Sequence, residues 1–478
     1  MPEKAAILGI GHGPQAYNGF VRVLLISTYD MGRQPFGLAS PAAWLQHAGL
    51  DVACADLSKE QLQDSAIEEA SLIAFFLPMH TATRLALPVI DRLRLMNPRA
   101  QLAAYGLYAP LNAAMLRAHG VTHVLGGEFE QDLLDVALNA ARGDAPPLAP
   151  AREAHQVPRS PASIPRLAFR VPLRDGLPPL ARYATLQIAG ERRTAGYSEA
   201  SRGCKHRCRH CPIVPVYNGR FRLVPVEVVL GDVRAQVAAG ARHITFGDPD
   251  FFNGIRHAEA VLAGMSREFQ GVTYDVTIKI EHLLKHAAQL PLLRETGCAF
   301  VTSAVESVDD RVLAKLDKGH TRADVERVVA LFGEIHLPLA ATFLPFTPWT
   351  TTASYLDLLH AIDALDLVES VSPVQLAVRL LIPEGSRMLE LPEVRAVTAA
   401  FNPASLTHPW VNADPAVDRL QEEVTRIVGT RLASPRREVF SQVWDAAHRH
   451  AKVSAPPRQA SGLLPRAAIP YLNEPWYC

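Results

Sequence analysis

The sequence predicts an α/β protein with an N-terminal doubly wound, Rossmann-like domain, a partial (βα)6 barrel and a helical C-terminal region. Two observations predict this class: short apolar runs alternate with helical stretches over residues 21–142, and the alternation returns after a proline-rich gap. Continuous apolar strands linked by helices are typical of parallel sheets that are covered on both faces. The expected segments are 1–142 for the first domain, 143–183 for a linker, 184–385 for the barrel and 386–478 for the helical region and tail.

The first domain is expected to begin with a buried strand, because residues 21–29 read VRVLLISTY. In the helix that follows, Ser40 is expected as the N-cap, Pro41 as the first helical residue and Gly49 as the residue beyond its end. The runs DVACA, SLIAFFL, QLAAY and THVL are each followed by a helical stretch, which completes five βα units. Ligands of such sheets bind at the carboxyl ends of the strands.

The linker is distinguished by nine prolines between residues 143 and 183, which favour an extended, semi-rigid chain. Beyond it, strands are expected just before Cys204 and at 243–247, 272–280, 298–305, 338–344 and 374–381. Helices are expected at 224–240, 255–269, 283–296, 309–317, 321–334 and 353–365. Six such units suit a partial parallel barrel whose active face carries the βα loops.

The amino-acid composition indicates which classes of binding partner to expect. The chain has 48 Lys+Arg and 48 Asp+Glu, so its formal net charge is zero, whereas a nucleic-acid binder usually has a basic excess. No apolar run reaches membrane-spanning length, and the N-terminus lacks the pattern of a secretory signal. Six cysteines, half of them clustered, suit a reducing compartment. We therefore expect a cytoplasmic protein that acts on a small-molecule substrate, without nucleic-acid or membrane partners.

The most informative motif is C-x3-C-x2-C, formed by Cys204, Cys208 and Cys211 in SRGCKHRCRHCP. A structural zinc site takes four ligands, and a fully cysteine-ligated cubane cluster takes four thiolates. Three thiolates on one loop suit a [4Fe–4S] cluster whose fourth iron is left open for chemistry. The alternative is a non-catalytic site, either an iron–sulfur module or a zinc site completed by His206 or His210.

In its spacing and its place after the first barrel strand, this motif resembles that of the radical S-adenosylmethionine (SAM) superfamily. The resemblance implies that the open iron binds SAM and that one electron cleaves SAM to a 5′-deoxyadenosyl radical. It also implies an electron donor such as flavodoxin or ferredoxin. His210 departs from the family, in which the residue before the third cysteine is commonly aromatic.

Two further motifs are similar to SAM-contacting segments of this family. Gly247 and Asp248 follow the second barrel strand in GDPDF, where the family orients the SAM amino group; a simple turn is the alternative. Glu306, in AVES, is followed by LAKLDKGHT, a run that resembles cobalamin-type members. Glu306 is thus a candidate to contact the ribose or methionine part of SAM. The alternative is a helix N-cap, for which Ser307 is the better candidate.

Two charged residues in predicted strands are further candidates. Arg379, within QLAVRLLIP, is expected to be buried and to need an anionic partner, either the SAM carboxylate or a structural acidic residue. Lys279 shares the polar side of the strand 272–280 with Asp275 and Thr277, so it is expected to point into the barrel. Lys279 is then either a catalytic residue or half of an ion pair with Asp275.

The N-terminal domain resembles the cobalamin-binding domain that precedes the barrel in many radical SAM enzymes. It lacks the D-x-H-x-x-G motif that supplies an axial histidine, and His80 is expected to be an ordinary loop residue. The resemblance therefore rests on fold and domain order. It makes cobalamin a candidate second cofactor, and methyl transfer to a small molecule the implied reaction.

The C-terminal part is similar to radical SAM proteins that end in Cys-Cys-Ala-Glu-Pro or Cys-selenocysteine-Ala-Glu-Pro. The shared runs are KIEHLL, AVES, TFLPFTPWTT and QLAVRLLIPEGSR, and this chain stops at Cys478. We hypothesise that a selenocysteine codon is read as stop at this point. A thiol–selenol pair would suit capture of a metalloid such as arsenic(III), with Cys478 as a catalytic residue and a SAM-derived radical acting directly. The simpler alternative is a free terminal thiol.

Overall fold

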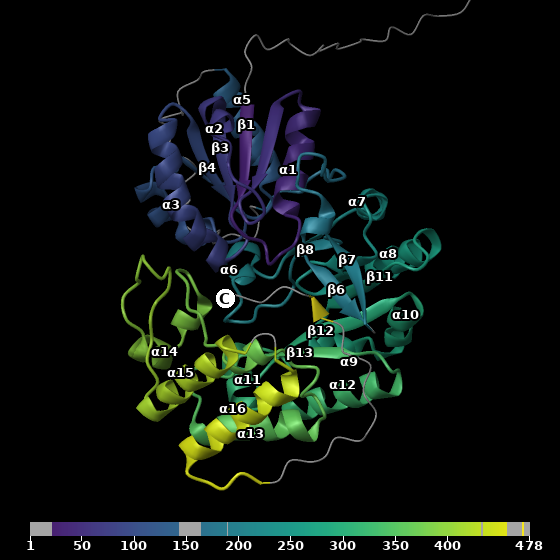
Figure 1. Ribbon diagram of the computed structural model, residues 1–478, viewed down its shortest axis with the longest axis vertical. Coiled ribbons are helices and arrows are strands. Elements are labelled where there is room, and N and C mark those ends of the chain that lie inside the picture. Colours follow the sequence, from purple (N-terminus) through teal and green to yellow (C-terminus); the bar gives the residue numbers. More distant parts are fainter. Residues whose placement is uncertain (1–21, 143–163, 189, 432–433, 457–470, 473–478) are drawn as a thin grey trace, which may run out of the picture.

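The computed structural model describes residues 22–142, 164–188, 190–431, 434–456 and 471–472. These residues form an N-terminal α/β unit, in the upper part of Figure 1, and a barrel-like α/β unit with C-terminal helices in the lower part. The predicted fold class is confirmed. The predicted domain limits remain predictions. None of the helices in the described ranges is both long and apolar enough to cross a bilayer.

The first sheet is entirely parallel. Its strands are β1 (Arg22–Ser27), β2 (Asp51–Asp56), β3 (Ala70–Phe76), β4 (Gln101–Tyr105) and β5 (His123–Val124), in the order β2-β1-β3-β4-β5. This is a doubly wound topology in which the order reverses between β1 and β3. Sheets of this kind bind ligands at that reversal, beyond the carboxyl ends of the strands.

Helices cover both faces of this sheet. They are α1 (Phe36–His47), α2 (Asp64–Glu68), α3 (His80–Met96), η1 (Pro110–Asn112), α4 (Ala113–Ala118) and α5 (Glu130–Ala141). Residues of α2, α3 and α4 pack in one apolar core, and residues of α1 and α5 pack in the other. The strands are buried on both faces, which explains their continuous apolar runs.

The expected start of the first helix is wrong. Helix α1 begins at Phe36, so Ser40 and Pro41 lie inside it. The Ser40 hydroxyl does not cap the helix, because it donates to Glu130 Oε1 of α5 at 2.7 Å. Gly49, with φ +81°, does lie just beyond the helix end, as predicted.

The barrel sheet contains five consecutive parallel strands. They are β7 (Glu191–Ser198), β10 (His243–Phe246), β11 (Thr273–Thr277), β12 (Cys298–Glu306) and β13 (Leu339–Phe343). At one edge, β6 (Thr185–Ile188) pairs antiparallel with β7, and β14 (Tyr471–Leu472) pairs antiparallel with β6. The strand predicted before Cys204 is therefore β7, which is followed by the short hairpin of β8 (Ser201–Gly203) and β9 (Phe221–Leu223).

The sixth predicted strand, 374–381, is wrong. Pro373 instead starts a short 3-10 helix, η6 (Pro373–Leu376). Beyond it, an isolated bridge pairs Arg379 with Phe346. The Gln375 side chain accepts a hydrogen bond from the Phe343 amide at 3.1 Å. A side chain thus takes the place of the backbone acceptor that a sixth strand would offer to the end of β13.

The remaining helices cover the outside of the barrel and its C-terminal side. The predicted helices correspond to α7 (Val226–Ala238), α8 (Ile255–Glu268), α9 (Ile280–Lys285) with α10 (Leu290–Glu295), α11 (Asp310–Leu316), α12 (Arg322–Glu334) and α13 (Thr352–Ala364). The C-terminal region adds α14 (Pro392–Val397), α15 (Pro415–Gly429) and α16 (Arg436–Ala451). Short elements are α6 (Ile213–Tyr217), η3 (Leu180–Arg182), η4 (Phe251–Gly254), η5 (Ala287–Gln289) and η7 (Arg387–Glu390).

The carboxyl edge of the first sheet faces the barrel. Leu107, which follows β4, packs with Val216 and Tyr217 of α6. The Tyr217 hydroxyl donates to Glu128 Oε1, in the loop after β5, at 3.1 Å. Because α6 begins two residues after Cys211, the ligand-binding edge of the first domain lies against the segment that carries the three cysteines.

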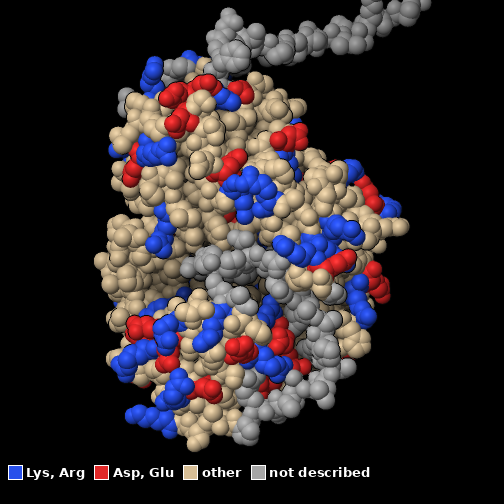
Figure 2. Space-filling view, in the orientation of Figure 1, with Lys and Arg blue, Asp and Glu red and all other residues tan. Residues whose placement is uncertain are grey.

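Charges of both signs are interspersed over the part of the surface that Figure 2 shows. On the described residues of this face no broad basic surface stands out. This distribution agrees with the zero formal net charge of the chain.

Candidate functional site

The three cysteines lie on the loop between β8 and α6, on the carboxyl side of the barrel. Gly203, immediately before Cys204, has φ +73°, and a Cβ there would lie 2.5 Å from the Arg220 carbonyl oxygen. Only glycine fits this combination of conformation and close approach. Asn253 of η4 accepts from the Lys205 amide at 3.3 Å and lies 3.9 Å from Cys204 Sγ. The start of the loop is thereby fixed to the barrel.

The end of α11 holds the middle of the same loop. The Arg209 amide donates to the Leu316 carbonyl at 2.9 Å, and the Arg209 guanidinium donates to the carbonyls of Ala314 and Lys315. These carbonyls lie in the last turn of a helix, where a cation is favourable. Arg387 donates to the Arg207 carbonyl at 2.6 Å. The loop is therefore braced before any cofactor binds.

The thiols are suited to bind a metal cluster rather than to react free in solution. Cys208 is buried, and Cys204 and Cys211 are half-buried. Burial raises the pKa of Cys204 to about 11 and that of Cys211 to about 12, so both are protonated at neutral pH without metal. Iron must therefore displace these protons, which couples cluster binding to proton release. Three thiols on one braced loop fit a cluster with one open iron.

Glu306 lies beside this loop, and its predicted contact with SAM stays a prediction. It ends β12 with φ +67°, at a register shift, and its Oε1 accepts from His210 Nε2 at 3.1 Å and Lys318 Nζ at 3.3 Å. Burial would raise the pKa of Glu306, but Lys318 and His210 outweigh it and hold the pKa at about 2. Glu306 is thus an ionised link between β12 and the cysteine loop. Ser307 is not the N-cap of α11; Asp309 is.

Asp248 is a positioning residue for the chain that enters the cysteine loop. It is buried, its Oδ2 accepts from the Ala200 amide at 2.9 Å, and its Oδ1 accepts from the Ser201 hydroxyl at 2.6 Å. Both oxygens are thus engaged within the fold, and burial raises the pKa of Asp248 to about 7. Gly247 is required sterically, since a Cβ would lie 1.7 Å from the Tyr197 hydroxyl oxygen.

The structure gives the two remaining candidates, Arg379 and Lys279, different partners. Arg379 donates to Asp418 Oδ1 at 2.7 Å and stacks on Trp410, with 3.6 Å from its guanidinium carbon to the ring centre. Its anionic partner is therefore a structural acidic residue, the second of the two alternatives. The expectation that Arg379 is buried is wrong, because a quarter of its side chain is exposed. Lys279 does not pair with Asp275, which instead accepts from His243 at 2.8 Å.

Lys279 lies next to the cysteine loop instead. It precedes α9 and places Nζ 3.2 Å from His206 Nδ1 and 3.2 Å from Glu281 Oε2. Its side chain is 9% exposed. The ammonium is thus half of an ion pair, with Glu281 rather than Asp275, at the edge of the candidate site. A catalytic role for Lys279 stays a prediction, and Cys478 lies outside the described residues.

Sequence reasoning missed several residues that complete this site. Lys318 lay within LAKLDKGHT, Asp250 within GDPDF and His282 within KIEHLL, but none was singled out. Asn253 carried no signal beyond its closeness to GDPDF. Their contacts with the cysteine loop span tens of residues in sequence, so a motif scan could locate the segments but not the pairing of side chains.

Comparison with known families bears on this site directly. Residues 198–358 match the model of the Radical SAM superfamily, and this range contains all three cysteines of the loop. This part of the chain is therefore similar to a radical SAM domain, the family that the cysteine motif resembles. Such a domain implies SAM and a [4Fe–4S] cluster.

Curated relatives match only the barrel-sized part of their own chains. Ribosomal protein uS12 methylthiotransferase RimO of Syntrophotalea carbinolica is 25% identical over 201 residues, which are 39% of this chain and 43% of that protein. The tRNA-2-methylthio-N(6)-dimethylallyladenosine synthase of Chlorobium luteolum is 28% identical over 153 residues, 30% of this chain and 33% of that protein. The chain thus spans less than half the length of these relatives.

Solved structures share the fold over most of the chain. The cobalamin-dependent SAM radical enzyme OxsB, with aqua-cobalamin bound, aligns with 90% of this chain and 72% of its own at a TM-score of 0.66 and 12% identity. The radical SAM methyltransferase TsrM from Kitasatospora setae, with cobalamin and a [4Fe–4S] cluster bound, aligns with 89% of this chain and 99% of its own. The TM-score is 0.63 and the sequence identity is 16%. At these identities the likeness shows a common fold.

Proposed function

We propose that this protein is a radical SAM enzyme in which Cys204, Cys208 and Cys211 hold a [4Fe–4S] cluster for the reductive cleavage of SAM. We further propose cobalamin as second cofactor and methyl transfer to a small molecule as the reaction. The observation that carries the proposal is the braced loop of three thiols, inside a radical SAM domain, with no fourth cysteine among the residues that form it. When bound, the cluster supplies the electron that cleaves the sulfonium of SAM.

The residues around the loop have defined parts in this proposal. Lys318 is buried near Cys208 and Cys211, where its positive charge offsets the negative charge of a thiolate-bound cluster. Glu306 fixes Lys318 and the loop residue His210. Gly247 and Glu306 remain our candidates for contacts with SAM. The electron comes from a reduced flavodoxin or ferredoxin, which would approach the loop from outside.

The case for cobalamin rests on the first domain. Its strand order reverses between β1 and β3, and its carboxyl edge packs against α6, next to the cysteine loop. A cofactor at that edge would therefore lie close to the cluster. His80, at the same edge, already has its Nε2 2.6 Å from the Ser405 carbonyl. We accordingly propose cobalamin bound without an axial histidine from this position.

The alternative of a metalloid substrate depends on Cys478. The last described residues, Tyr471 and Leu472, pair with β6 at the edge of the barrel sheet. Cys478 itself lies outside the described residues. The resemblance to the proteins with Cys-Cys-Ala-Glu-Pro tails remains a prediction.

Anaerobic reconstitution with iron and sulfide tests the first part of the proposal. With dithionite, the reconstituted protein is expected to cleave SAM to 5′-deoxyadenosine and methionine, or to methylate when a substrate and cobalamin are present. Cys208→Ala should abolish cleavage and reduce bound iron, whereas Cys54→Ala, whose cysteine lies in β2, should retain both. Absence of any SAM turnover by a protein with a full cluster would overturn the enzyme assignment.

Reconstitution with hydroxocobalamin tests the second part. We expect one cobalt per chain after gel filtration and an absorption spectrum of protein-bound cobalamin. Cobalamin that separates from the protein, while SAM cleavage persists, would favour direct action of a SAM-derived radical.

A further inference from the structure

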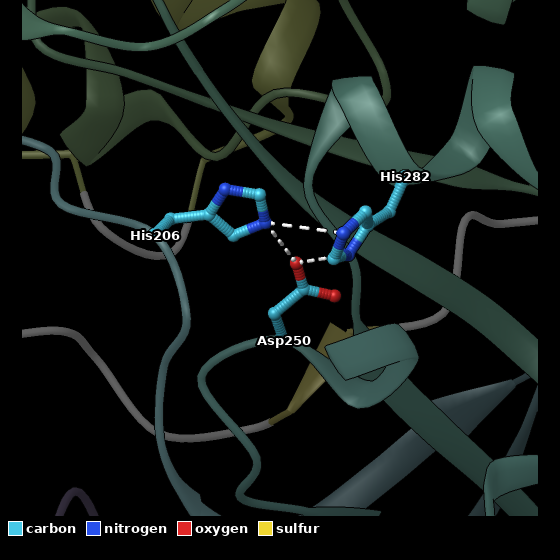
Figure 3. A group of neighbouring side chains, drawn as sticks. All are labelled: His206, Asp250 and His282. Atoms are coloured by element: carbon cyan, nitrogen blue, oxygen red, sulfur yellow. Dashed lines mark hydrogen bonds and ion pairs between the residues drawn. The ribbon is translucent and has the colours of Figure 1, made fainter. Parts of the chain in front are cut away.

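Three side chains that the proposed function leaves without a role converge beside the cysteine loop (Figure 3). His206 comes from the loop itself, Asp250 precedes η4, and His282 lies on α9. His206 Nε2 is 3.3 Å from Asp250 Oδ2 and 3.2 Å from His282 Nε2, and His282 Nδ1 is 2.6 Å from Asp250 Oδ2. One nitrogen or oxygen atom of each residue lies within 4.8 Å of the other two.

The group is buried, and two of its polar atoms lack a hydrogen-bond partner. The side chains of Asp250 and His282 are each 1% exposed, and that of His206 is 12% exposed. Asp250 Oδ2 forms ion pairs with His282 Nδ1 at 2.6 Å and His206 Nε2 at 3.3 Å, but neither Asp250 Oδ2 nor His282 Nδ1 has a hydrogen-bond partner. The other oxygen, Oδ1, accepts from the Phe252 amide at 3.1 Å. Buried polar atoms without a partner are costly, so this arrangement calls for an occupant.

We propose that His206, Asp250 and His282 bind one divalent transition-metal cation, at a site separate from the cluster. Two imidazole nitrogens and one carboxylate oxygen are a donor set of mononuclear zinc and non-haem iron(II) sites. Around a tetrahedral ion with bonds of 2.0–2.1 Å, ligand atoms lie about 3.3–3.4 Å apart. His206 Nε2 lies 3.3 Å from Asp250 Oδ2 and 3.2 Å from His282 Nε2, both close to this value. The 2.6 Å contact of Asp250 is with the other ring nitrogen of His282, Nδ1, so a metal bound through His282 Nε2 would replace that contact.

The surroundings of His206 support this use of its Nε2. The opposite ring nitrogen, Nδ1, lies 3.6 Å from Glu281 Oε2 and 3.2 Å from Lys279 Nζ. The Lys279 ammonium can only donate, so Nδ1 accepts from it in this structure and Nε2 carries the proton. A metal at Nε2 would displace that proton to Nδ1, whose nearby acceptor is the Glu281 carboxylate. Histidine ligands are commonly oriented by a carboxylate in this way.

The three ligands belong to three different segments of the barrel. Asp250 is fixed at the start of η4, His282 by the first turn of α9, and His206 lies between Cys204 and Cys208. A cation held by all three would fasten the cysteine loop to the barrel on the side opposite α11. None of the ligands is a cysteine, so zinc binding can be measured separately from cluster binding and SAM cleavage.

Zinc titration of the cluster-loaded protein tests the proposal. After removal of loosely bound metal, we expect one Zn(II) per chain in addition to the cluster iron. X-ray absorption at the zinc edge should show nitrogen or oxygen neighbours at about 2.0–2.1 Å and no sulfur at about 2.3 Å. A sulfur shell would place zinc on the cysteines and overturn the proposal, as would the absence of stoichiometric zinc. This measurement needs no variant.

Variants then assign the ligands. Asp250→Asn and His282→Gln should each weaken zinc binding at least tenfold, while the iron content stays that of the wild type. His286→Gln is the matched control, because its ring lies 5.8 Å from that of His282 but outside the three-residue group. Unchanged zinc affinity in Asp250→Asn would show that the group is a metal-free hydrogen-bonded cluster. If the wild-type protein binds zinc but does not cleave SAM, that result would count against the proposed function alone.

Discussion

At the scale of single residues, Lys318 is the buried cation of the cysteine site. Its side chain is 4% exposed and pairs with Glu306, whose side chain is 12% exposed. Removing one member of a buried pair leaves the other charge uncompensated, which costs about 3–5 kcal/mol. The charges of Cys208 and Cys211 help to raise the pKa of Lys318 despite its burial, so its ammonium is coupled to the cluster ligands as well.

We therefore predict that Lys318→Met lowers the free energy of unfolding by about 3–5 kcal/mol in urea titrations. We also predict a more negative reduction potential of the reconstituted cluster, since a nearby positive charge is lost. Lys315→Met is the control, because Lys315 forms an exposed pair with Glu393 and its loss should change little. Equal destabilisation by the two variants would show that Lys318 has no special role.

At the scale of elements, the turn between β8 and the cysteine loop depends on one glycine. In Gly203→Ala the new Cβ would lie 2.4 Å from the Tyr217 ring and 2.5 Å from the Arg220 carbonyl oxygen. We predict lower iron content after reconstitution and a lower melting temperature, because the loop must shift. Gly240→Ala is matched for strain, with φ +98°, but its Cβ meets no atom within 4 Å. If both variants lose iron equally, the close approach is not what positions the loop.

The elements also show what the sequence can predict. Strand β1 is predictable because both of its faces are buried and its apolar run is continuous. Local signals failed where a distant group intervened: Glu130 takes the hydroxyl of Ser40, and Gln375 takes the amide of Phe343. The three cysteines were predictable because their spacing is local. The convergence of Asp250 with His282 depends on tertiary approach and was not.

At the scale of the whole molecule, a buried arginine joins the two α/β units. Arg202 of β8 forms an ion pair with Glu130 Oε1 at 2.6 Å and donates to Glu128 Oε2 at 3.4 Å, both in the first unit. Its side chain is 7% exposed, and both glutamate side chains are fully buried. This contact fixes the carboxyl edge of the first sheet against the segment that leads into the cysteine loop, and so sets the distance between the two proposed cofactors.

We predict that Arg202→Met loosens this junction, because two buried carboxylates lose their counter-charge at a cost of about 3–5 kcal/mol. Limited proteolysis should cut the chain between the two units faster than in the wild type. Arg193→Met, which removes an exposed pair with Glu191, should leave the rate unchanged. Identical cleavage of wild type and Arg202→Met would contradict a locking role.

The same junction predicts a dependence of stability on pH through Glu199. Burial raises the pKa of Glu199 from 4.5 to about 7, although Arg202 opposes the rise. Between these values the unfolded chain has released the proton while the folded protein still holds it. Stability therefore falls as pH rises from about 4.5 to about 7 and is constant above, by an amount on the order of 3 kcal/mol.

Glu199→Gln removes this titration and keeps an acceptor for Arg202 Nε, which lies 2.8 Å from Glu199 Oε2. We predict similar urea midpoints for wild type and variant near pH 4.5, and a higher midpoint for the variant at pH 8. Burial also raises the pKa values of Asp30 and Asp248 to about 7. Both residues are present in wild type and variant, so they lower the stability of the two proteins equally as pH rises to about 7. The difference between the two curves therefore isolates Glu199. Curves that run parallel from pH 4.5 to pH 8 would show that Glu199 is already ionised in the folded protein at low pH, and that Arg202 outweighs burial at this junction.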